Sequence, residues 1–369
     1  MKFTVRKHDI LDVLSRVQGL AGRKSNLAIT SNILLRSEAS GIAISATDLE
    51  TGFEGTYPAV VESEGSLAIS ARKFYEIARD FPIDEIVIHE VENRWIKIGS
   101  RNIEYHIVGM NPEDFPSIPR VEGVQFFEMD SESLKKMIEK TTIVVASDDK
   151  RAHIVGVFME KVSEDAKDLI RMVSTDGSRL SKVDYPLEGE VDMAAGFLIP
   201  KKGLAEVGKF LQSEGRVQVG CKENHFIVKK NKEVIIIRLL DGEFPEYKEI
   251  ISKKDGNCIE LNRQMFLMML KRMSILSSDS YKGVIFNFSD DRLVVSSTNP
   301  DIGESKEEMP IEFKANPIEV AFNPRFFIET LSVMDDETVR LIIADEEKPC
   351  LIEGHEDRHY LSIIMPMRL

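Results

Sequence analysis

The sequence is poor in cysteine and has no long apolar run. Its three cysteines, Cys221, Cys258 and Cys350, stand far apart, which argues against a disulfide framework and indicates a reducing compartment. No window approaches the run of about 18 apolar residues that a transmembrane helix needs. The start, MKFTVRKHD, is charged and has no apolar run behind it. We therefore expect a cytoplasmic protein without a membrane span or a secretory signal.

Recognisable catalytic and cofactor motifs are also missing. The sequence contains no G-x-G-x-x-G, Walker loop, H-E-x-x-H or G-x-S-x-G pattern. The histidines do not cluster, and the one close pair, His355 and His359, lies in a predicted hairpin tip. The aspartate pairs at 148–149 and 290–291 stand in polar segments typical of solvated turns. The sequence thus predicts no catalytic residue, no cofactor and no metal site.

The chain contains one sequence segment that is repeated three times. Residues 173–186 read VSTDGSRLSKVDYP, a near copy spans 44–58, and a weaker copy spans 295–310. The closing prolines of the three copies are separated by 128 and 124 residues. A repeat of that length is too long for a solenoid, whose unit is about 20–50 residues, and has the size of a domain. The spacing therefore predicts three domains of one fold.

Turn-rich segments mark the ends of these three units. They read Met110-Asn-Pro-Glu-Asp-Phe-Pro116, Leu240-Asp-Gly-Glu-Phe-Pro245 and Ile364-Met-Pro-Met367. Proline, glycine and aspartate at such positions are typical of seams between domains. We place the three domains at residues 1–122, 123–251 and 252–369.

Each unit is expected to combine two helices with antiparallel strands, an α+β fold. Apolar spacing and capping residues predict helices at 6–18, 70–81, 131–141, 200–211, 263–273 and 323–331. Alternating residues predict strands, as at 103–107, where isoleucine and tyrosine alternate with Glu104 and His106.

The net charge of −14 would ordinarily argue against nucleic acid as a partner. The six predicted helices together carry +8, so the remaining residues carry −22. If the helices share one side of the sheets, that side is electropositive and can hold phosphates, while the rest of the surface repels them. The alternative is that lysine and arginine simply solvate the helix surfaces.

The repeated segment itself allows two interpretations. Thr175-Asp176-Gly-Ser-Arg179 could be a nucleophile with an acid, or a structural turn. The first copy, at 47–49, keeps the threonine and the aspartate but not the serine or the arginine. That favours a turn in which the aspartate side chain bonds backbone groups.

Taken together, these features resemble one family over the whole length of the chain, the bacterial DNA polymerase III beta subunit, or beta sliding clamp. The matching segments are the MKFTV start, Ala46-Thr-Asp-Leu-Glu50, Ala71-Arg-Lys-Phe74, Asp114-Phe-Pro116, Val173-Ser-Thr-Asp-Gly-Ser-Arg-Leu180, Pro200-Lys-Lys-Gly203, Asp241-Gly-Glu-Phe-Pro-Glu-Tyr247 and the terminal Met365-Pro-Met-Arg-Leu369. Their order and joint coverage carry the resemblance.

The resemblance implies a head-to-tail homodimer that forms a ring, with antiparallel sheets outside and two helices of each domain inside. Such a clamp is not an enzyme: it encircles double-stranded DNA without reading its sequence and serves as a processivity factor in DNA replication. Its implied partners are DNA, the replicative polymerase alpha subunit, the clamp loader and other proteins with a clamp-binding motif.

The resemblance also implies three sets of functional residues. Candidates for facing DNA are Lys24, Arg72, Lys73, Arg151, Lys201 and Lys202. The positions that match a peptide-binding groove are Ile154, Thr175, Gly177, Ser178, Arg179, Leu180, Pro245, Ile250, Ile363, Met365, Pro366, Met367 and Arg368. The implied dimer interface joins Tyr105 and Ile107 to Ile275 and Leu276. Ser178 departs from the histidine that is frequent in the family at this position, which bears on peptide preference.

Two readings outside this family remain open from the sequence. One is a repetitive, β-rich, non-catalytic scaffold protein that does not bind DNA. The other is a hydrolase that uses one of the carboxylate pairs. Retention on circular DNA would separate the clamp from both.

Overall fold

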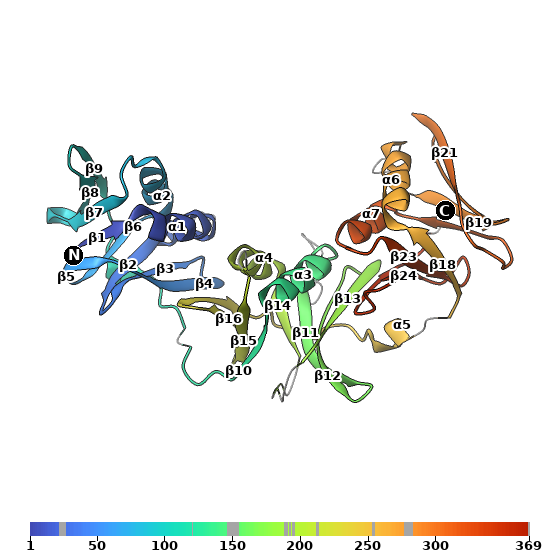
Figure 1. Cartoon of the computed structure of the whole chain (residues 1–369), viewed down its shortest axis with the longest axis horizontal. Helices are drawn as coiled ribbons and strands as arrows, with labels where there is room; N and C mark the ends of the chain where they lie inside the picture. The colour runs from blue at the N-terminus through green and yellow to red at the C-terminus, as the bar shows by residue number, and fades with distance from the viewer. Residues whose placement is uncertain are drawn as a thin grey trace. The chain divides into compact units, whose positions relative to one another are not determined.

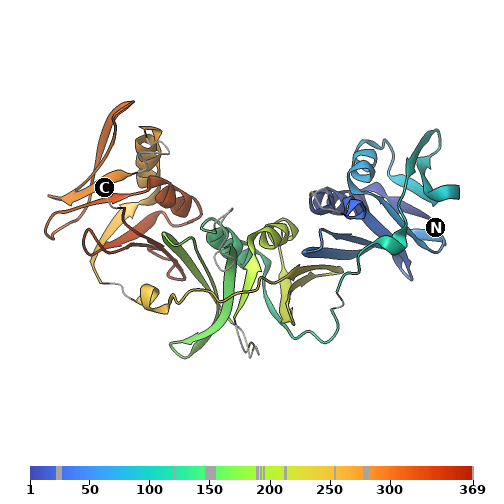
Figure 2. The ribbon, with the colours of Figure 1, turned by 180° about the vertical axis from the view of Figure 1, so that it is seen from behind.

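The computed structural model describes residues 1–21, 27–119, 121–145, 155–187, 191, 193, 196–211, 214–252, 255–276 and 283–367 (Figures 1 and 2). It divides into two compact units. Unit 1 comprises Met1–Glu132 and Lys202–Leu239, and unit 2 comprises Ser133–Lys201 and Leu240–Leu369. No helix among the described residues is both long enough and apolar enough to cross a membrane.

The chain runs through three similar series of elements. The first is β1 (Lys2–Arg6), α1 (Lys7–Ala21), η1 (Ala28–Ser31), β2 (Asn32–Glu38), β3 (Gly41–Thr47), β4 (Thr51–Tyr57), β5 (Val60–Ser63), β6 (Ser66–Ser70), α2 (Ala71–Asp80), β7 (Glu85–Glu90), η2 (Glu92–Arg94), β8 (Trp95–Ser100), β9 (Ile103–Val108) and η3 (Pro112–Asp114).

The second and third series repeat this order with small changes. The second is β10 (Phe126–Asp130), α3 (Ser131–Thr142), β11 (Gly156–Glu164), β12 (Lys167–Thr175), β13 (Arg179–Pro186), β14 (Phe197–Pro200), α4 (Lys201–Phe210), β15 (Arg216–Lys222), β16 (His225–Lys230), β17 (Glu233–Arg238) and α5 (Lys248–Ser252). The third is β18 (Asn257–Asn262), α6 (Arg263–Met273), η5 (Ser274–Leu276), β19 (Val284–Ser289), β20 (Arg292–Asn299), β21 (Gly303–Pro310), β22 (Ile318–Phe322), α7 (Pro324–Ser332), β23 (Thr338–Ile343), β24 (Cys350–Gly354) and β25 (Tyr360–Ile364).

All of these strands pair antiparallel. Unit 1 holds a five-stranded sheet, β5-β1-β7-β8-β9, and an eight-stranded sheet, β10-β15-β16-β17-β4-β3-β2-β6. Unit 2 holds an eight-stranded sheet, β14-β11-β12-β13-β25-β24-β23-β18, and a four-stranded sheet, β21-β20-β19-β22. The predicted α+β architecture of three similar antiparallel domains is confirmed.

Each eight-stranded sheet joins one repeat to the next. In unit 1, β17 pairs with β4 from Glu233↔Gly55 to Ile237↔Thr51; we call this pairing the first junction. In unit 2, β13 pairs with β25 from Arg179↔Ile364 to Val183↔Tyr360, the second junction. Main-chain hydrogen bonds therefore connect successive repeats.

Helices in each unit are positioned by one apolar face and by side-chain caps. α1 packs beside α2 and buries Ile10, Leu14 and Val17, while α6 packs beside α7 (Figure 1). The Asn262 side chain accepts from the backbone N–H of Met265 at 3.0 Å and so caps α6. The apolar spacing and the caps predicted these helices correctly, because both signals are local in the sequence.

An aromatic cluster forms the core of the third repeat. Phe286 of β19 lies 5.1 Å from Phe327 of α7 and 5.3 Å from Phe322 of β22, measured between ring centroids. Phe266 of α6 approaches both Phe286 and Phe327 at 6.1 Å. These offset and edge-on contacts fix both helices on the sheet.

The six predicted helices are confirmed, with ends that differ by up to three residues. The five-residue helix α5 was not predicted. The predicted domain boundaries stay a prediction: the first lies between η3 and β10, and the second lies within α5.

Candidate functional site

The repeated segment forms a tight turn between β12 and β13. The Asp176 side chain accepts from the backbone N–H groups of Ser178 and Arg179, at 2.9 and 3.0 Å. The Thr175 hydroxyl donates to the carbonyl of Arg179 at 2.7 Å and accepts from the N–H of Gly177 at 3.1 Å. The Thr175 hydroxyl and one carboxylate oxygen of Asp176 therefore bond the backbone of the turn.

The first repeat builds the same turn without the serine or the arginine. The Asp48 side chain accepts from the N–H groups of Glu50 and Thr51, and the Thr47 hydroxyl donates to the carbonyl of Thr51. Leu49 and Gly177 occupy equivalent positions, with φ of 79° and 88°. The structural interpretation of the Thr-Asp motif is confirmed.

Arg179 connects this turn to two other elements of unit 2. Its buried guanidinium pairs with Asp176 at 3.0 Å and donates to the carbonyl of Ile143, just beyond α3, at 3.0 Å. It also pairs with Glu329 of α7 at 2.6 Å and lies 4.3 Å above the ring of Phe326. One side chain thus holds the turn, the end of α3 and α7 together.

Glu329 is shared between a buried and an exposed cation. Besides Arg179, the exposed Arg325 one turn earlier pairs with it at 2.7 Å. Burial tends to raise the pKa of the Glu329 carboxyl, but the hydrogen bonds from Arg325 and Arg179 outweigh it and hold the pKa below its usual range. The carboxyl group is therefore ionised at neutral pH.

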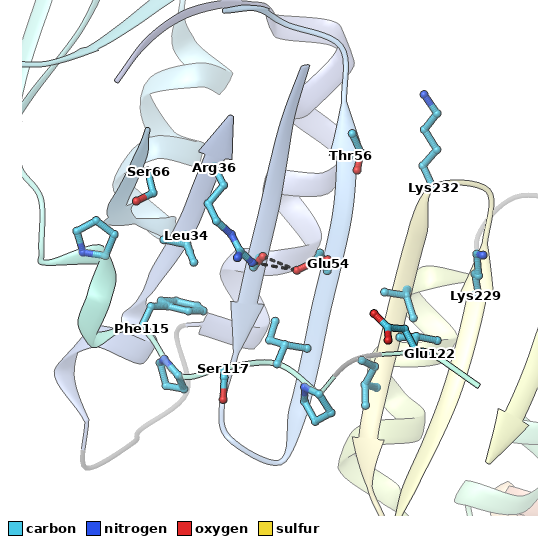
Figure 3. A pocket seen from close by; sticks show the side chains of 18 of the residues that line it. Leu34, Arg36, Glu54, Thr56, Ser66, Phe115, Ser117, Glu122, Lys229 and Lys232 are labelled. Carbon is cyan, nitrogen blue, oxygen red and sulfur yellow. Dashed lines mark hydrogen bonds and ion pairs between the residues drawn. The ribbon is translucent and has the colours of Figure 1, made fainter. Parts of the chain in front are cut away.

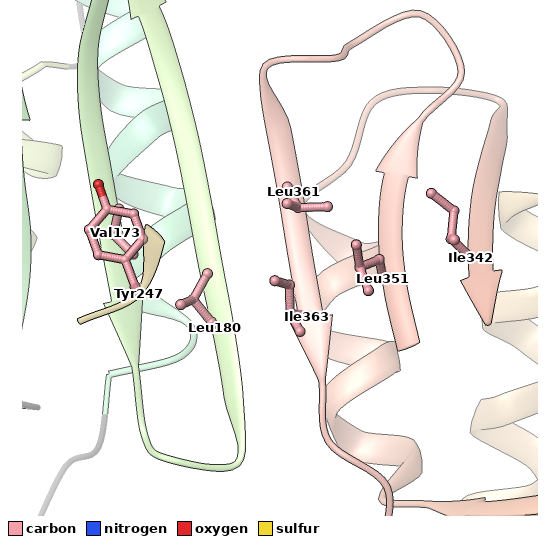
Figure 4. Packing of buried hydrophobic residues seen from close by; sticks show 7 residues of the cluster. All are labelled: Val173, Leu180, Tyr247, Ile342, Leu351, Leu361 and Ile363. Atoms are coloured by element: carbon pink, nitrogen blue, oxygen red, sulfur yellow. The ribbon is translucent and has the colours of Figure 1, made fainter. Parts of the chain in front are cut away.

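Next to the turn, an apolar cluster covers one face of the second junction. Its buried members are Val173, Leu180, Tyr247, Ile342, Leu351, Leu361 and Ile363, and the partly buried Phe158, Phe244 and Ile251 pack against it (Figure 4). The Phe158 and Phe244 rings stack with centroids 5.1 Å apart. Residues 240–247, the second linker, thus cross the sheet and add their aromatic side chains to the cluster.

The C-terminal strand places several predicted groove residues beside the turn. Leu180 lies opposite Ile363 in the ladder, and the N–H of Met365 donates to the carbonyl of Ser178 at 2.9 Å. Met367 continues the pairing by donating to the carbonyl of Ala321 at 2.8 Å.

Apolar side chains on the predicted groove remain in contact with solvent. Ile250, Met365 and Met367 are 43%, 42% and 36% exposed. Pro245 is also exposed, while Pro366 is partly buried. Ile154 and Arg368 lie outside the described residues. Exposed methionine and isoleucine beside a buried apolar floor form a surface that can adapt to an apolar ligand.

The predicted DNA-facing residues have different environments. Arg72 and Lys73 of α2 are exposed and share one carboxylate, Glu76, so this group keeps a net positive charge. Lys202 is exposed at the start of α4. Lys201 is partly buried, which lowers its pKa, and its ammonium donates to the carbonyl of Val145 at 3.1 Å. Lys24 and Arg151 lie outside the described residues.

The predicted interface residues lie on the edge strand β9 and on the short helix η5. Tyr105, 42% exposed, and Ile107 belong to β9, the last strand of the five-stranded sheet. Ile275 is 74% exposed on η5, and the carbonyl of Leu276 accepts from the Asn299 amide at 2.9 Å. Asn299 ends β20, which pairs with the edge strand β21.

Within the part of the chain that the structure describes, no group of three or more potential ligands could hold a metal ion. The aspartates at 290–291 form the turn between β19 and β20, where Asp291 accepts from the N–H of Phe313. The pair at 148–149 lies in a stretch that is not described. His355 and His359 lie between β24 and β25, as predicted.

Several residues around the predicted groove were not predicted as site residues. They are Phe158, Val173, Phe244, Tyr247, Ile251, Phe326 and Glu329. Phe244 and Tyr247 stand within the matched segment 241–247, so the aromatic content of that segment was a usable signal. Phe326 and Glu329 become neighbours of the turn only through the tertiary fold.

Comparison with known proteins places the whole chain in one family. Models of the DNA polymerase III beta subunit match it in three consecutive stretches: the N-terminal domain at 1–119, the central domain at 128–246 and the C-terminal domain at 248–368. The beta sliding clamp of Pseudomonas putida is 27% identical over 373 aligned positions, covering all of both chains.

Solved structures agree with this match. The DNA polymerase III subunit beta from Pseudomonas aeruginosa superposes with a TM-score of 0.93 at 26% identity and full coverage of both chains. A sliding clamp from Bartonella birtlesii, bound to griselimycin, gives 0.94 at 26% identity, again with full coverage. The fold is therefore that of a three-domain DNA clamp. The chain belongs to the DNA polymerase III beta subunit family, the beta sliding clamps.

The Arg179–Glu329 pair leads to a prediction about stability. Replacing Arg179 by methionine removes the buried partner of Glu329, so we expect R179M to lower the free energy of unfolding by about 3 kcal/mol at pH 7. R325M, which removes the exposed partner, should cost less than about 1 kcal/mol. Urea titrations of both variants measure the difference.

The pH dependence follows from the lowered pKa of Glu329. A carboxyl with a lowered folded-state pKa adds stability above its unfolded pKa, and this stability is lost as the pH falls through the folded value. The difference in the free energy of unfolding between R179M and the unsubstituted protein should therefore shrink as the pH falls through the lowered folded-state pKa of Glu329. A difference that stays constant with pH would contradict the assignment.

Proposed function

We propose that the chain closes head to tail with a second copy of itself into a ring around double-stranded DNA and tethers replication proteins there. One observation supports the proposal: the two junctions inside the chain pair equivalent strands, and the strands of a third equivalent junction are not paired with each other. At each internal junction the fourth strand of one sheet pairs with the last strand of the next repeat's sheet. Among the described residues, the fourth strand β21 of the third repeat and the last strand β9 of the first repeat have no pairing of this type.

Strand order identifies these equivalents. The strands β4, β13 and β21 end the equivalent series β6-β2-β3-β4, β14-β11-β12-β13 and β22-β19-β20-β21. The strands β9, β17 and β25 end the equivalent series β1-β7-β8-β9, β10-β15-β16-β17 and β18-β23-β24-β25. Because β4 pairs with β17 and β13 pairs with β25, the equivalent pairing for β21 is with β9. Within this proposal, β21 of one copy would pair with β9 of another copy. An edge strand exposes unpaired backbone groups, which such an addition would satisfy.

The repeats also supply the register of this third junction. The residue cross-strand from the repeated threonine is Gly52 in the first repeat, Leu180 in the second and Glu304 in the third. Gly52 lies opposite Ile236 across the first junction, and Leu180 lies opposite Ile363 across the second.

The counterpart of Ile236 and Ile363 on β9 is found by counting across the sheets. Three ladders correspond: Phe3↔Ile88↔Ile98↔Tyr105, Phe127↔Val219↔Val228↔Ile235 and Ile259↔Leu341↔Ile352↔Ser362. Tyr105 thus corresponds to Ile235 and Ser362. The next residue, His106, therefore corresponds to Ile236 and Ile363. The third junction would place His106 opposite Glu304 and Glu104 opposite Lys306.

The side chains in this register have complementary charges. Glu104 would face Lys306, and His106 would face Glu304, all four on exposed strand positions. In the single chain Glu104 instead pairs with Lys97 and His106, whose hydrogen bonds lower its pKa. Apolar Tyr105, Ile107, Ile275 and Leu276 flank the same edges. Opposite charges placed cross-strand stabilise a pairing and fix its register.

A closed ring explains how a chain of charge −14 would hold DNA. Arg72, Lys73 and Lys202 lie on helices, as do Arg325 and Lys271, and together they offer cations for phosphate contacts. Such contacts carry no sequence information and leave the protein free to slide. Lys24, Arg151 and Lys201 complete the proposed DNA-facing set.

The groove at the second junction is proposed to bind peptides of the replicative polymerase alpha subunit, the clamp loader and other proteins with a clamp-binding motif. Support comes from the exposed Ile250, Met365 and Met367 beside the buried floor of Leu180 and Ile363. The protein would act as a non-catalytic cytoplasmic tether. The Thr-Asp turn, once a candidate for hydrolysis, is occupied by backbone hydrogen bonds.

A charge exchange tests the third junction. K306E would place two carboxylates opposite each other, and we expect the dimer to dissociate about tenfold more readily, since two junctions would each lose about 0.7 kcal/mol. E104K combined with K306E should restore the affinity. K314E, an exposed lysine away from the ladder, is the control. Sedimentation equilibrium measures these constants, and a double variant no tighter than K306E would contradict the register.

Encirclement is tested by DNA topology. After loading by a clamp loader, the protein should stay on closed circular DNA for many minutes and leave within seconds once the circle is cut by a restriction enzyme. The variant I275K/L276K, expected to be monomeric, should be retained on neither form. Equal lifetimes on circular and linear DNA would rule out a topological link.

The groove proposal predicts the effect of removing the last five residues. Deleting residues 365–369 should leave the dimer intact in sedimentation but reduce binding of a labelled polymerase alpha-subunit peptide at least a hundredfold. Fluorescence anisotropy provides the measurement. M265S/M268S, which changes two exposed methionines of α6, should bind normally. Unchanged binding by the deletion variant would reject the groove.

A further inference from the structure

The first junction holds an open cleft that the proposed function does not use. A cavity of about 1030 Å³ lies on one face of the eight-stranded sheet of unit 1, beside the first linker, residues 111–119 (Figure 3). Leu34, Phe115, Val234 and Ile236 give it an apolar lining. Its volume is at the upper end of the range, about 300–1000 Å³, that is typical of ligand sites.

The cleft is the internal counterpart of the groove at the second junction. One cross-strand row of the first sheet reads Leu34, Ser45, Glu54, Val234. The equivalent row of the second sheet reads Phe158, Val173, Lys182, Leu361. Both rows face the linker that crosses the sheet. The two sites therefore have the same architecture and different side chains.

The first linker also has a smaller side chain than the second linker at one equivalent position. Phe115-Pro-Ser-Ile118 stands where the second linker has Phe244-Pro-Glu-Tyr247. Tyr247 is buried and its hydroxyl contacts Glu160, so its ring fills the second site. Ile118 has no ring, and it lies directly over Gly52, where an added Cβ would come within 3.0 Å of its Cγ2.

Smaller side chains at the first junction contribute to the space in its cleft. Phe158, Val173 and Tyr247 at the second junction correspond to Leu34, Ser45 and Ile118 at the first. Each replacement removes apolar volume from the space between sheet and linker, and the linker backbone does not collapse to fill it. The Glu54 carboxylate on the floor is held by Ser45 at 3.1 Å and Arg36 at 3.3 Å.

A second, smaller cavity on the same linker strengthens the parallel. It measures about 220 Å³ and is lined by Thr47, Leu49 and Gly52 of the first turn, together with Ile236 and Arg238. These positions correspond to Thr175, Gly177, Leu180, Ile363 and Met365 of the proposed groove. Both sides of the first linker are thus accessible, along a path that an extended peptide could follow at about 3.3 Å per residue.

Two lysines on the rim of the cleft favour a ligand with negative charge. Lys229 and Lys232 on the β16–β17 hairpin are exposed, and no ion pair of either is found among the described residues. Figure 3 shows both lysines on the side of the cleft opposite Phe115 and Ser117. The rim also carries Glu113 on the linker, and Figure 3 shows Glu122 on the same side as the two lysines, so these three groups leave that side with a net charge of +1. An anionic group bound here would therefore sit against the hairpin, with apolar groups over the sheet.

We propose that this cleft is a second peptide-binding site, which takes an extended segment of a partner protein that carries apolar side chains next to carboxylates. The proposal rests on the proposed function of its counterpart at the second junction. It gives the clamp two kinds of docking site per chain, one apolar and methionine-rich and one flanked by lysines. Two partners with different motifs could then be held on one subunit.

Photo-crosslinking to the full chain tests this proposal. The probe is an acetylated hexapeptide of alternating leucine and aspartate in which one leucine is replaced by benzoyl-phenylalanine. We expect saturable crosslinks within residues 34–56 and 229–236, mapped by mass spectrometry. K229E/K232E should lower their yield at least tenfold, and K229R/K232R should preserve it. A probe with lysine in place of aspartate should crosslink at least tenfold less.

Matched controls separate this proposal from the function on which it rests. K167E/K314E changes two exposed lysines elsewhere and should leave the crosslinks within twofold. Deleting residues 365–369 should remove only crosslinks near 175–180, 245–251 and 363–367. Crosslinks confined to those segments, insensitivity to K229E/K232E, or no crosslink at 34–56 and 229–236 would each overturn the second site. The first of these outcomes would leave the groove at the second junction standing.

Discussion

Pairing of strand edges is the constraint on which the rest of this structure depends. Each repeat builds two sheets that end in an open edge, and unpaired backbone N–H and C=O groups at an edge attract another strand. Inside the chain the constraint is satisfied twice, by β17 with β4 and by β13 with β25. Among the described residues, two strands remain without an equivalent pairing: β9, which corresponds to β17 and β25, and β21, which corresponds to β4 and β13. Under the proposed function, a second copy of the chain would supply these missing partners.

The two internal junctions show how one architecture can acquire different surfaces. Both place a linker across a sheet and a Thr-Asp turn at its end, and in both turns the side chains of the pair satisfy backbone groups. At the second junction aromatic rings fill the space and Arg179 ties the turn to α7. At the first, smaller side chains leave a cleft bordered by lysines. The two junctions thus share a backbone arrangement and differ in their side chains.

Much of this architecture was predictable from the sequence because its signals are local. The helices follow from apolar spacing and from caps such as Asn262 and Asn323, and the threefold layout follows from the recurring Thr-Asp turn. The contacts of Arg179 with Ile143 and Glu329 were not predictable, since they join residues far apart in the sequence. The cleft at Leu34 and Ser45 was missed for a similar reason: an empty volume depends on which side chains meet across strands, and no short motif records it.

Amide hydrogen exchange of the edge strands tests the central claim most directly. In the assembled protein, the outward-facing amides of β9 and β21 should be protected together, and dilution to the monomer should release both while β4, β13, β17 and β25 remain protected. If β9 and β21 exchange as fast in the assembled protein as in the monomer, the copies do not join through these edges, and the account of a ring closed by a third junction is wrong.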